Sequence, residues 1–273
     1  MPPNPGITRN VSLHSQTYPS KAHPHPQGPS SLRTNPKPPP KQPRILYLLA
    51  NSHSLTIYVA PASTVNILDL SDLNAALRRN DKNALALKWL LEASPIIKVF
   101  FDARVAAQIL FERCEIKLAV EGSIKRAYIH ELQMMEVALR RSDRDREWLA
   151  GLDRCIAQDS DLAGGMGVGV VFDRRILHLP ILWQKYHGQL TRGGFDVGGP
   201  FWIMMIREAT KERLEVARSE KHRGYDADGA RSGWWEESIQ ERSDSWNEGV
   251  MMDPYTEGEF MGGKDHWTQF DVL

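Results

Sequence analysis

The sequence predicts an α/β domain with a mixed β-sheet and helices on both sides of it. Three observations favour this class: an early series of short runs rich in Ile, Leu, Val and Tyr, one near-continuous apolar run after them, and helical patterns beyond. At 273 residues, the chain has room for one such domain and two tails. We divide it into a disordered, Pro-rich basic tail (1–43), the folded domain (44–218) and an acidic, Trp-containing flexible tail (219–273).

Composition separates the two tails from the domain. Residues 1–43 hold 12 of the 17 prolines, and no acidic residue precedes Asp69. Few apolar residues are present there to offset the entropy of ordering, although the prolines could also be a ligand for an aromatic-lined groove. Residues 233–273 carry ten acidic residues against Arg242 and Lys264, and the tryptophans there could anchor a protein partner. We therefore expect any protein partners to bind through the tails.

The domain begins with three short apolar runs that predict an antiparallel meander. They cover 45–49, 55–59 and 65–70 and are separated by turn-forming residues. Ser71 then predicts the N-cap of a helix over 72–79. A further helix is predicted over 84–92.

The following segment predicts a β-α-β unit. Pro95 ends the preceding helix, and the apolar run 96–101 is typical of a strand covered on both faces. Asp102 predicts the N-cap of a helix whose apolar residues recur from Ala103 to Phe111 as one stripe. The remaining predicted elements are a strand over 116–120 and helices over 131–141, 144–157, 176–190 and 201–218.

Charge, hydropathy and cysteine content exclude several classes of protein. Lys+Arg and Asp+Glu number 34 each, so net charge does not favour nucleic acid or acidic partners. No apolar run approaches the roughly 20 residues of a membrane span, and the N-terminus lacks the pattern of a secretory signal. Two cysteines cannot build a disulfide framework or a zinc site. We expect an intracellular protein, of nucleus or cytoplasm, with no membrane partner.

Several motifs resemble a known family when they are read in order. Residues 98–104 (KVFFDAR) resemble K-V-F-F-D-x-R-N-D, and 133–140 (QMMEVALR) resemble Q-L-M-E-x-A-x-R. Residues 151–156 (GLDRCI) match G-L-x-x-C-I, and 177–183 (LHLPILW) match a leucine-proline helix. The Trp, Thr and Arg of a last helix, W-x-x-x-v-x-x-x-T-x-x-R, are matched by Trp202, Thr210 and Arg213. Together these motifs resemble the RNase D-like 3′–5′ exonuclease domain of the DEDD type, in its fungal branch.

The resemblance implies an RNase H-like fold and a metal-dependent hydrolysis for which four carboxylates hold two Mg²⁺ or Mn²⁺ ions. The first two carboxylates belong to a strand before Leu55, where this chain has no acidic residue. The third falls on Ala106. The fourth falls on Arg175 if the sequences are aligned without a gap, but residues 171–175 better resemble the family's upstream V-F-N-x-R, which implies that the segment carrying the fourth carboxylate is deleted before Ile176. We therefore expect an RNase H-like mixed sheet, flanked by helices and incomplete at its first strand. We also expect no cofactor, and a catalytically degenerate domain.

Three functions stay open at this point. The first is residual nucleic-acid binding, through candidate phosphate contacts at Lys98, Arg104, Lys117, Lys125 and Arg126. The second is an active exonuclease that uses Mg²⁺ or Mn²⁺ with replacement carboxylates. Its candidates are Asp69, Asp102 and Asp173, with Asp102 as the metal ligand. The third is a non-enzymatic scaffold that recruits proteins through its tails.

Overall fold

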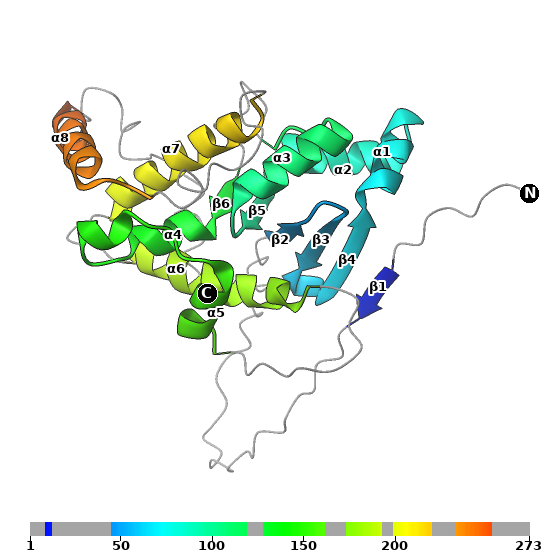
Figure 1. The fold of residues 1–273 in the computed structure, drawn as a ribbon, viewed down its shortest axis with the longest axis horizontal. Coiled ribbons are helices and arrows are strands. Elements are labelled where there is room, and N and C mark those ends of the chain that lie inside the picture. The colour runs from blue at the N-terminus through cyan, green and yellow to red at the C-terminus, as the bar shows by residue number, and fades with distance from the viewer. Residues whose placement is uncertain are drawn as a thin grey trace, which may run out of the picture.

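The computed structural model describes residues 9–12, 45–118, 128–161, 173–192, 199–219 and 233–252. These residues form one mixed sheet with helices on both of its faces (Figure 1), so the predicted α/β class is confirmed. The strand order is β1-β4-β3-β2-β5-β6. The strands are β1 (Arg9–Ser12), β2 (Ile45–Ala50), β3 (Ser54–Val59), β4 (Thr64–Asp69), β5 (Ile97–Phe100) and β6 (Ile129–Glu131).

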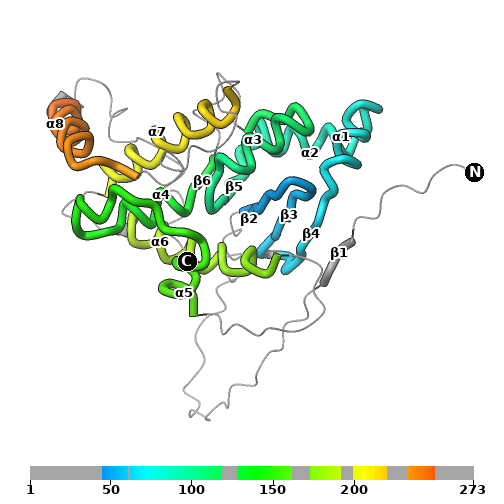
Figure 2. The backbone as a smooth tube through the Cα atoms, in the orientation of Figure 1, coloured from blue at the N-terminus to red at the C-terminus, as the bar shows by residue number. Residues whose placement is uncertain are grey.

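The first strand of the domain, β2, lies inside the sheet. It pairs antiparallel with β3 and parallel with β5, while β3 pairs antiparallel with β4 (Figure 2). Strand β6 pairs parallel with β5. The expectation of a sheet incomplete at its first strand is therefore corrected: β2 is present, and it can be interior because its first four residues, Ile45–Leu48, are all buried.

Eight α-helices are described beside this sheet. They are α1 (Leu70–Arg78), α2 (Lys82–Glu92), α3 (Ala103–Cys114), α4 (Leu132–Ala138), α5 (Leu152–Asp159), α6 (Leu179–Arg192), α7 (Gly199–Ala217) and α8 (Glu236–Met252). Short 3-10 turns are η1 (Ala60–Ala62), η3 (Asp143–Arg146) and η4 (Arg174–His178). The predicted helix 144–157 is thus two shorter elements, because α5 starts only after Gly151.

Aspartates start the first three helices. The carboxylate of Asp69 accepts hydrogen bonds from the backbone N–H groups of Ser71 and Asp72, so Asp69 caps α1 and the prediction of Ser71 was wrong. Asp81 caps α2. Asp102 caps α3, as predicted, by accepting from Arg104 N. A carboxylate accepts more strongly than a hydroxyl at a positive helix N-terminus, which explains why Asp69 serves in place of Ser71.

The parallel partner of β5 was predicted in the wrong place. The described residues 116–118 form no strand, although Ile116 and Leu118 are buried. Strand β6 instead covers 129–131, where the sequence predicts the start of a helix. Its last residue is the fully buried Glu131, and a charged residue within a three-residue strand hides the apolar pattern that would reveal it.

Two hydrophobic cores cover the opposite faces of the sheet. One packs α4, α5, η4 and α6 against residues such as Tyr47 and Val99. The other packs α1, α2 and α3 against residues such as Leu48 and Phe100. Helix α7 belongs to both, since its first half supplies Ile203 and Ile206 to one core and its last turns supply Leu214 and Ala217 to the other.

Parts of both predicted tails have regular structure. Strand β1 pairs with β4 at the edge of the sheet. Helix α8, within the predicted flexible tail, packs on α7 by placing Ile239 against Phe201 and Met205. Residues 219 and 233–235 are also described, and the remaining residues of the two tails lie outside the described residues. Among the helices described, none is long and apolar enough to cross a membrane.

Candidate functional site

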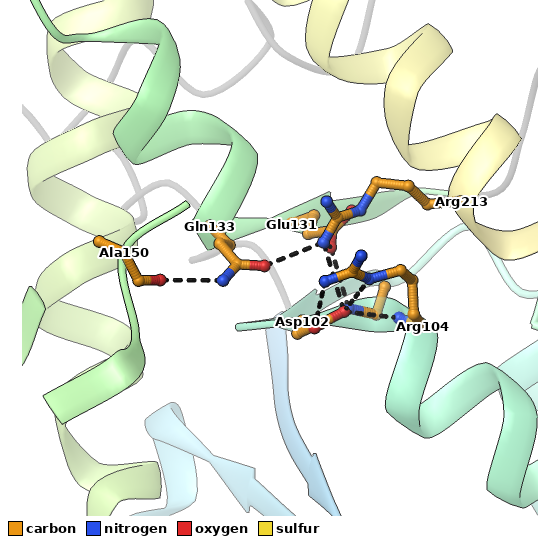
Figure 3. Close-up of polar contacts among 7 residues, drawn as sticks. Asp102, Arg104, Glu131, Gln133, Ala150 and Arg213 are labelled. Atoms are coloured by element: carbon orange, nitrogen blue, oxygen red, sulfur yellow. Dashed lines mark hydrogen bonds and ion pairs between the residues drawn. The ribbon is translucent and has the colours of Figure 1, made fainter. Parts of the chain in front are cut away.

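A cluster of charged side chains lies where the parallel strands β5 and β6 end. Asp102 follows β5, Glu131 ends β6 and Gln133 lies in α4, while Arg104 and Arg213 reach in from α3 and α7 (Figure 3). The carboxyl ends of parallel strands are the usual place for functional residues in open α/β sheets. This cluster is therefore the first candidate site of the protein.

Arg213 is the centre of the cluster. Its Nη2 atom lies 2.8 Å from Oε1 of Glu131, 2.9 Å from Oε1 of Gln133 and 3.4 Å from Oδ1 of Asp102. One guanidinium nitrogen is thus surrounded by oxygens from three side chains. In such a buried position a charge needs this kind of pairing to be tolerated.

Asp102 is held by a second guanidinium. Its Oδ1 accepts from the backbone N and from Nε of Arg104, each at 3.0 Å, and its Oδ2 lies 2.8 Å from Nη2 of the same residue. Burial by itself would raise the pKa of Asp102. The hydrogen bonds from Arg104 and the charge of Arg213 outweigh burial and hold the pKa below its usual value. Asp102 is therefore an ionised, fully engaged carboxylate.

Glu131 is the most enclosed member of the cluster, with no exposed surface. Its Oε1 also accepts from Ala103 N at 3.2 Å, whereas its Oε2 has no hydrogen-bond partner among the described residues. Burial raises the pKa of Glu131 despite the nearby charge of Arg213. Gln133 donates to the carbonyl of Ala150 at 2.8 Å, which ties the cluster to the loop before α5. The network joins four elements and holds two carboxylates against two guanidiniums.

The described residues do not fit a centre for two divalent ions. Such a centre needs several carboxylate oxygens free to coordinate, and arginines engage both carboxylates here. Strand β2 offers no carboxylate. Ala106, the position implied for the third carboxylate, is a core residue of α3 and is 1% exposed. Across the residues that the structure covers, no group of three His, Cys, Asp or Glu side chains could hold a metal ion.

The other two replacement carboxylates also act as helix caps. Asp69 caps α1, and Asp173 caps η4 by accepting from Arg175 N at 3.0 Å. The Arg175 guanidinium also bonds to both oxygens of Asp173, at 2.6 to 3.0 Å. Burial works to raise the pKa of Asp173, but these bonds lower it overall. Each of the three aspartates therefore has a local structural partner.

The candidate phosphate contacts differ in their placement. Lys98 is 1% exposed, its Nζ donates to Ser94 O at 2.7 Å, and burial lowers its pKa to about 8. Arg104 is buried against Asp102, as described above. Lys117 is exposed beside the C-terminus of α2, where its backbone N donates to Glu92 at 2.8 Å. Lys125 and Arg126 lie outside the described residues. Of the described candidates, Lys117 presents its charge to solvent.

Sequence reasoning missed the roles of Glu131, Gln133 and Arg213. The last two lie within motifs that carry the family resemblance, so their type and order were visible, but nothing indicated that they would meet. Glu131 was assigned to a helix. A signal was available in the acidic residue directly after Ile129-His130, since a carboxylate at the end of a buried strand requires a cation nearby.

Comparisons with known proteins give one structural similarity. No family model matches the chain, and no curated protein matches it. Among solved structures, the chain is similar to Trypanosoma brucei RNase D in its complex with RNA U12. The two chains are 14% identical, the match covers 74% of this chain and 72% of the other, and the TM-score is 0.48. At this identity the similarity concerns the course of the backbone and not the residues of a site.

Proposed function

We propose that this protein is an RNase D-like, nucleic-acid-binding domain in which the positions of the metal-binding carboxylates are lost and the carboxylates at the ends of β5 and β6 are engaged in an internal ion-pair network. The observation that carries the proposal is the position of Arg213, with one nitrogen within 3.4 Å of oxygens from Asp102, Glu131 and Gln133. Carboxylates held in this way are unavailable to Mg²⁺ or Mn²⁺.

Contacts between residues of separate motifs support the RNase D-like part of this proposal. Asp102, Gln133 and Arg213 come from three separate motifs of the resemblance, and they join in one network. The strand order also supports it. An RNase H-like sheet has three consecutive antiparallel strands, with two parallel strands on the other side of the first, and β4-β3-β2-β5-β6 follows that order.

The segment between α3 and β6 is the best candidate for contacting phosphates. Residues 117–126 contain Lys117, Lys125 and Arg126 against the single acidic residue Glu121. Phosphate contacts of this kind position a nucleic acid without reading its sequence. We therefore infer sequence-independent binding of nucleic acid.

A degradation assay tests the absence of catalysis. The full chain is incubated with 3′-labelled single-stranded RNA or DNA and Mg²⁺ or Mn²⁺, with EDTA as the control, and we expect no shortening. The decisive variant is Asp102→Asn, because asparagine can still cap α3 but cannot supply a carboxylate to a metal ion. Shortening that is abolished both by EDTA and by Asp102→Asn would establish an active enzyme and refute the proposal.

Salt-dependent binding tests the phosphate contacts. We expect affinity for a labelled 12-mer to fall with salt, and the triple variant Lys117→Glu/Lys125→Glu/Arg126→Glu to reduce the log–log slope by roughly 2, at about 0.7 for each lost single-strand contact. The matched control reverses exposed charges elsewhere, with Arg79→Glu, Arg154→Glu and Lys211→Glu. Equal slopes for the two triple variants would place the binding surface elsewhere.

A further inference from the structure

Two half-exposed tryptophans form one surface near the C-terminal helix. Trp148 is 52% exposed and Trp235 is 51% exposed, and their ring centroids lie 6.5 Å apart in an edge-on arrangement. Backbone hydrogen bonds bring their segments together, from Gly233 N to Glu147 O at 2.6 Å and from Trp234 N to Arg146 O at 2.9 Å. Two large aromatic rings exposed side by side are typical of an interaction surface.

Packing beneath this surface holds it in place. The Trp234 ring lies 5.6 Å from that of Trp202, and the guanidinium of Arg146 lies over Trp202 at 4.2 Å. Trp246 on α8 contacts Phe201 edge-on at 6.1 Å. The surface is therefore supported by a layer of packed aromatic rings, so a ligand would order few additional side chains on binding.

The charges around the surface select the kind of ligand. Helix α8 starts directly after Trp235 with the exposed Glu236 and Glu237, and it has five acidic residues against Arg242, which itself pairs with Glu208. Residues 141–148 have three arginines and three acidic residues, so they do not offset this negative charge. A negative aromatic surface disfavours phosphates and favours a basic ligand with an apolar ridge.

We propose that the Trp148–Trp235 surface binds the proline-rich segment 36–43 of this chain, from the same copy or a neighbouring one. That segment, PKPPPKQP, has five prolines, Lys37 and Lys41, and no acidic residue. Proline favours the extended polyproline II helix, and aromatic-lined surfaces recognise that conformation. This helix rises about 3.1 Å per residue, so two to three residues span the distance between the rings, and the lysines complement Glu236 and Glu237.

Indole N–H signals in NMR spectra of the full chain test the proposal. The signals are assigned with Trp→Phe variants, and wild type is compared with the full-length variant P38A/P39A/P40A. We expect the signals of Trp148 and Trp235 to shift between the two, and that of Trp89, which is 58% exposed on α2, to stay. Adding a peptide of residues 34–44 to the variant restores the wild-type positions.

Affinities of the peptide complete the test. In the P38A/P39A/P40A background, Trp148→Ala weakens peptide binding by about tenfold or more, as expected for a central aromatic contact, whereas Trp89→Ala does not. A peptide with Lys37→Glu and Lys41→Glu binds more weakly. Dependence of the indole shifts on protein concentration identifies a neighbouring copy as the source, and independence identifies the same copy. The proposal is overturned by unchanged signals, by equal affinities of the two Trp→Ala variants, or by an oligonucleotide that moves these signals when the peptide does not.

Discussion

Replacing Arg213 with methionine removes the guanidinium from the charged cluster while keeping most of the aliphatic stem. Glu131 then has no counter-ion at 2.8 Å, and its side chain has no exposed surface from which to reach water. Removing one partner of a buried ion pair costs about 3–5 kcal/mol, because the other charge stays buried and unpaired. We expect a loss of this size in the free energy of unfolding near pH 7.

The loss depends on pH in a direction that the Glu131 pKa determines. Burial already raises the pKa of Glu131 in the folded protein above its ordinary value of 4.5, and removing Arg213 raises it further. Between the unfolded and folded pKa values, the folded state binds more protons, so stability falls as pH rises through that range. The deficit of Arg213→Met relative to wild type should therefore be smallest near pH 4 and grow at higher pH.

Urea denaturation at several pH values measures these differences. The matched control is Arg242→Met, whose ion pair with Glu208 is half exposed on both sides, and which should cost less than about 1 kcal/mol. Adding Glu131→Gln to Arg213→Met should recover part of the loss, because the buried charge is then removed. The reasoning fails if Arg213→Met costs no more than Arg242→Met at pH 7, or if its deficit is independent of pH.

Three further predictions concern single positions. Lys98→Met should be neutral or stabilising at pH 7, since no carboxylate of the described residues pairs with the buried ammonium. The folded-state pKa of Lys98, about 8, lies below the ordinary 10.5, so the advantage of methionine should shrink from pH 8 to 10.5 in denaturation curves. Gly233→Ala places a Cβ 2.0 Å from Arg146 O and should speed amide exchange in α8, whereas Gly151→Ala, with nothing within 4 Å, should not. Asp81→Ala removes the cap of α2 and should cost about 1 kcal/mol of unfolding free energy; no measurable loss would mean that other contacts hold that helix end.

The parts of the fold that follow from local pattern could be predicted from the sequence. The meander, the strand at β5 and the Asp102 cap depend on alternation, apolar runs and one short-range hydrogen bond, and each was predicted within two residues. Strand β6 could not be predicted in this way. It has three residues and ends in a buried carboxylate, so it forms only because β5 supplies its hydrogen bonds and α7 supplies a cation.

The candidate site shows the same limit. Asp102 was named from the sequence, and its hydrogen bonds with Arg104 are local, but its contact with Arg213 joins residues that lie 111 positions apart in the chain. Lys98 was named as a candidate phosphate contact, since lysine is rarely buried, yet it is 1% exposed within β5. Contacts at such separations are set by tertiary packing, which a local pattern does not report.

Helix α7 has a consequence for how the chain acquires its structure during synthesis. Its residues complete both hydrophobic cores, and its Arg213 neutralises a charge that β6 has already committed to the interior. A ribosome-bound chain that has not yet released residues 203–217 therefore carries two unfinished cores and an unmatched Glu131. The two cores should consequently become protease-resistant together, in one late step, when α7 emerges from the ribosome.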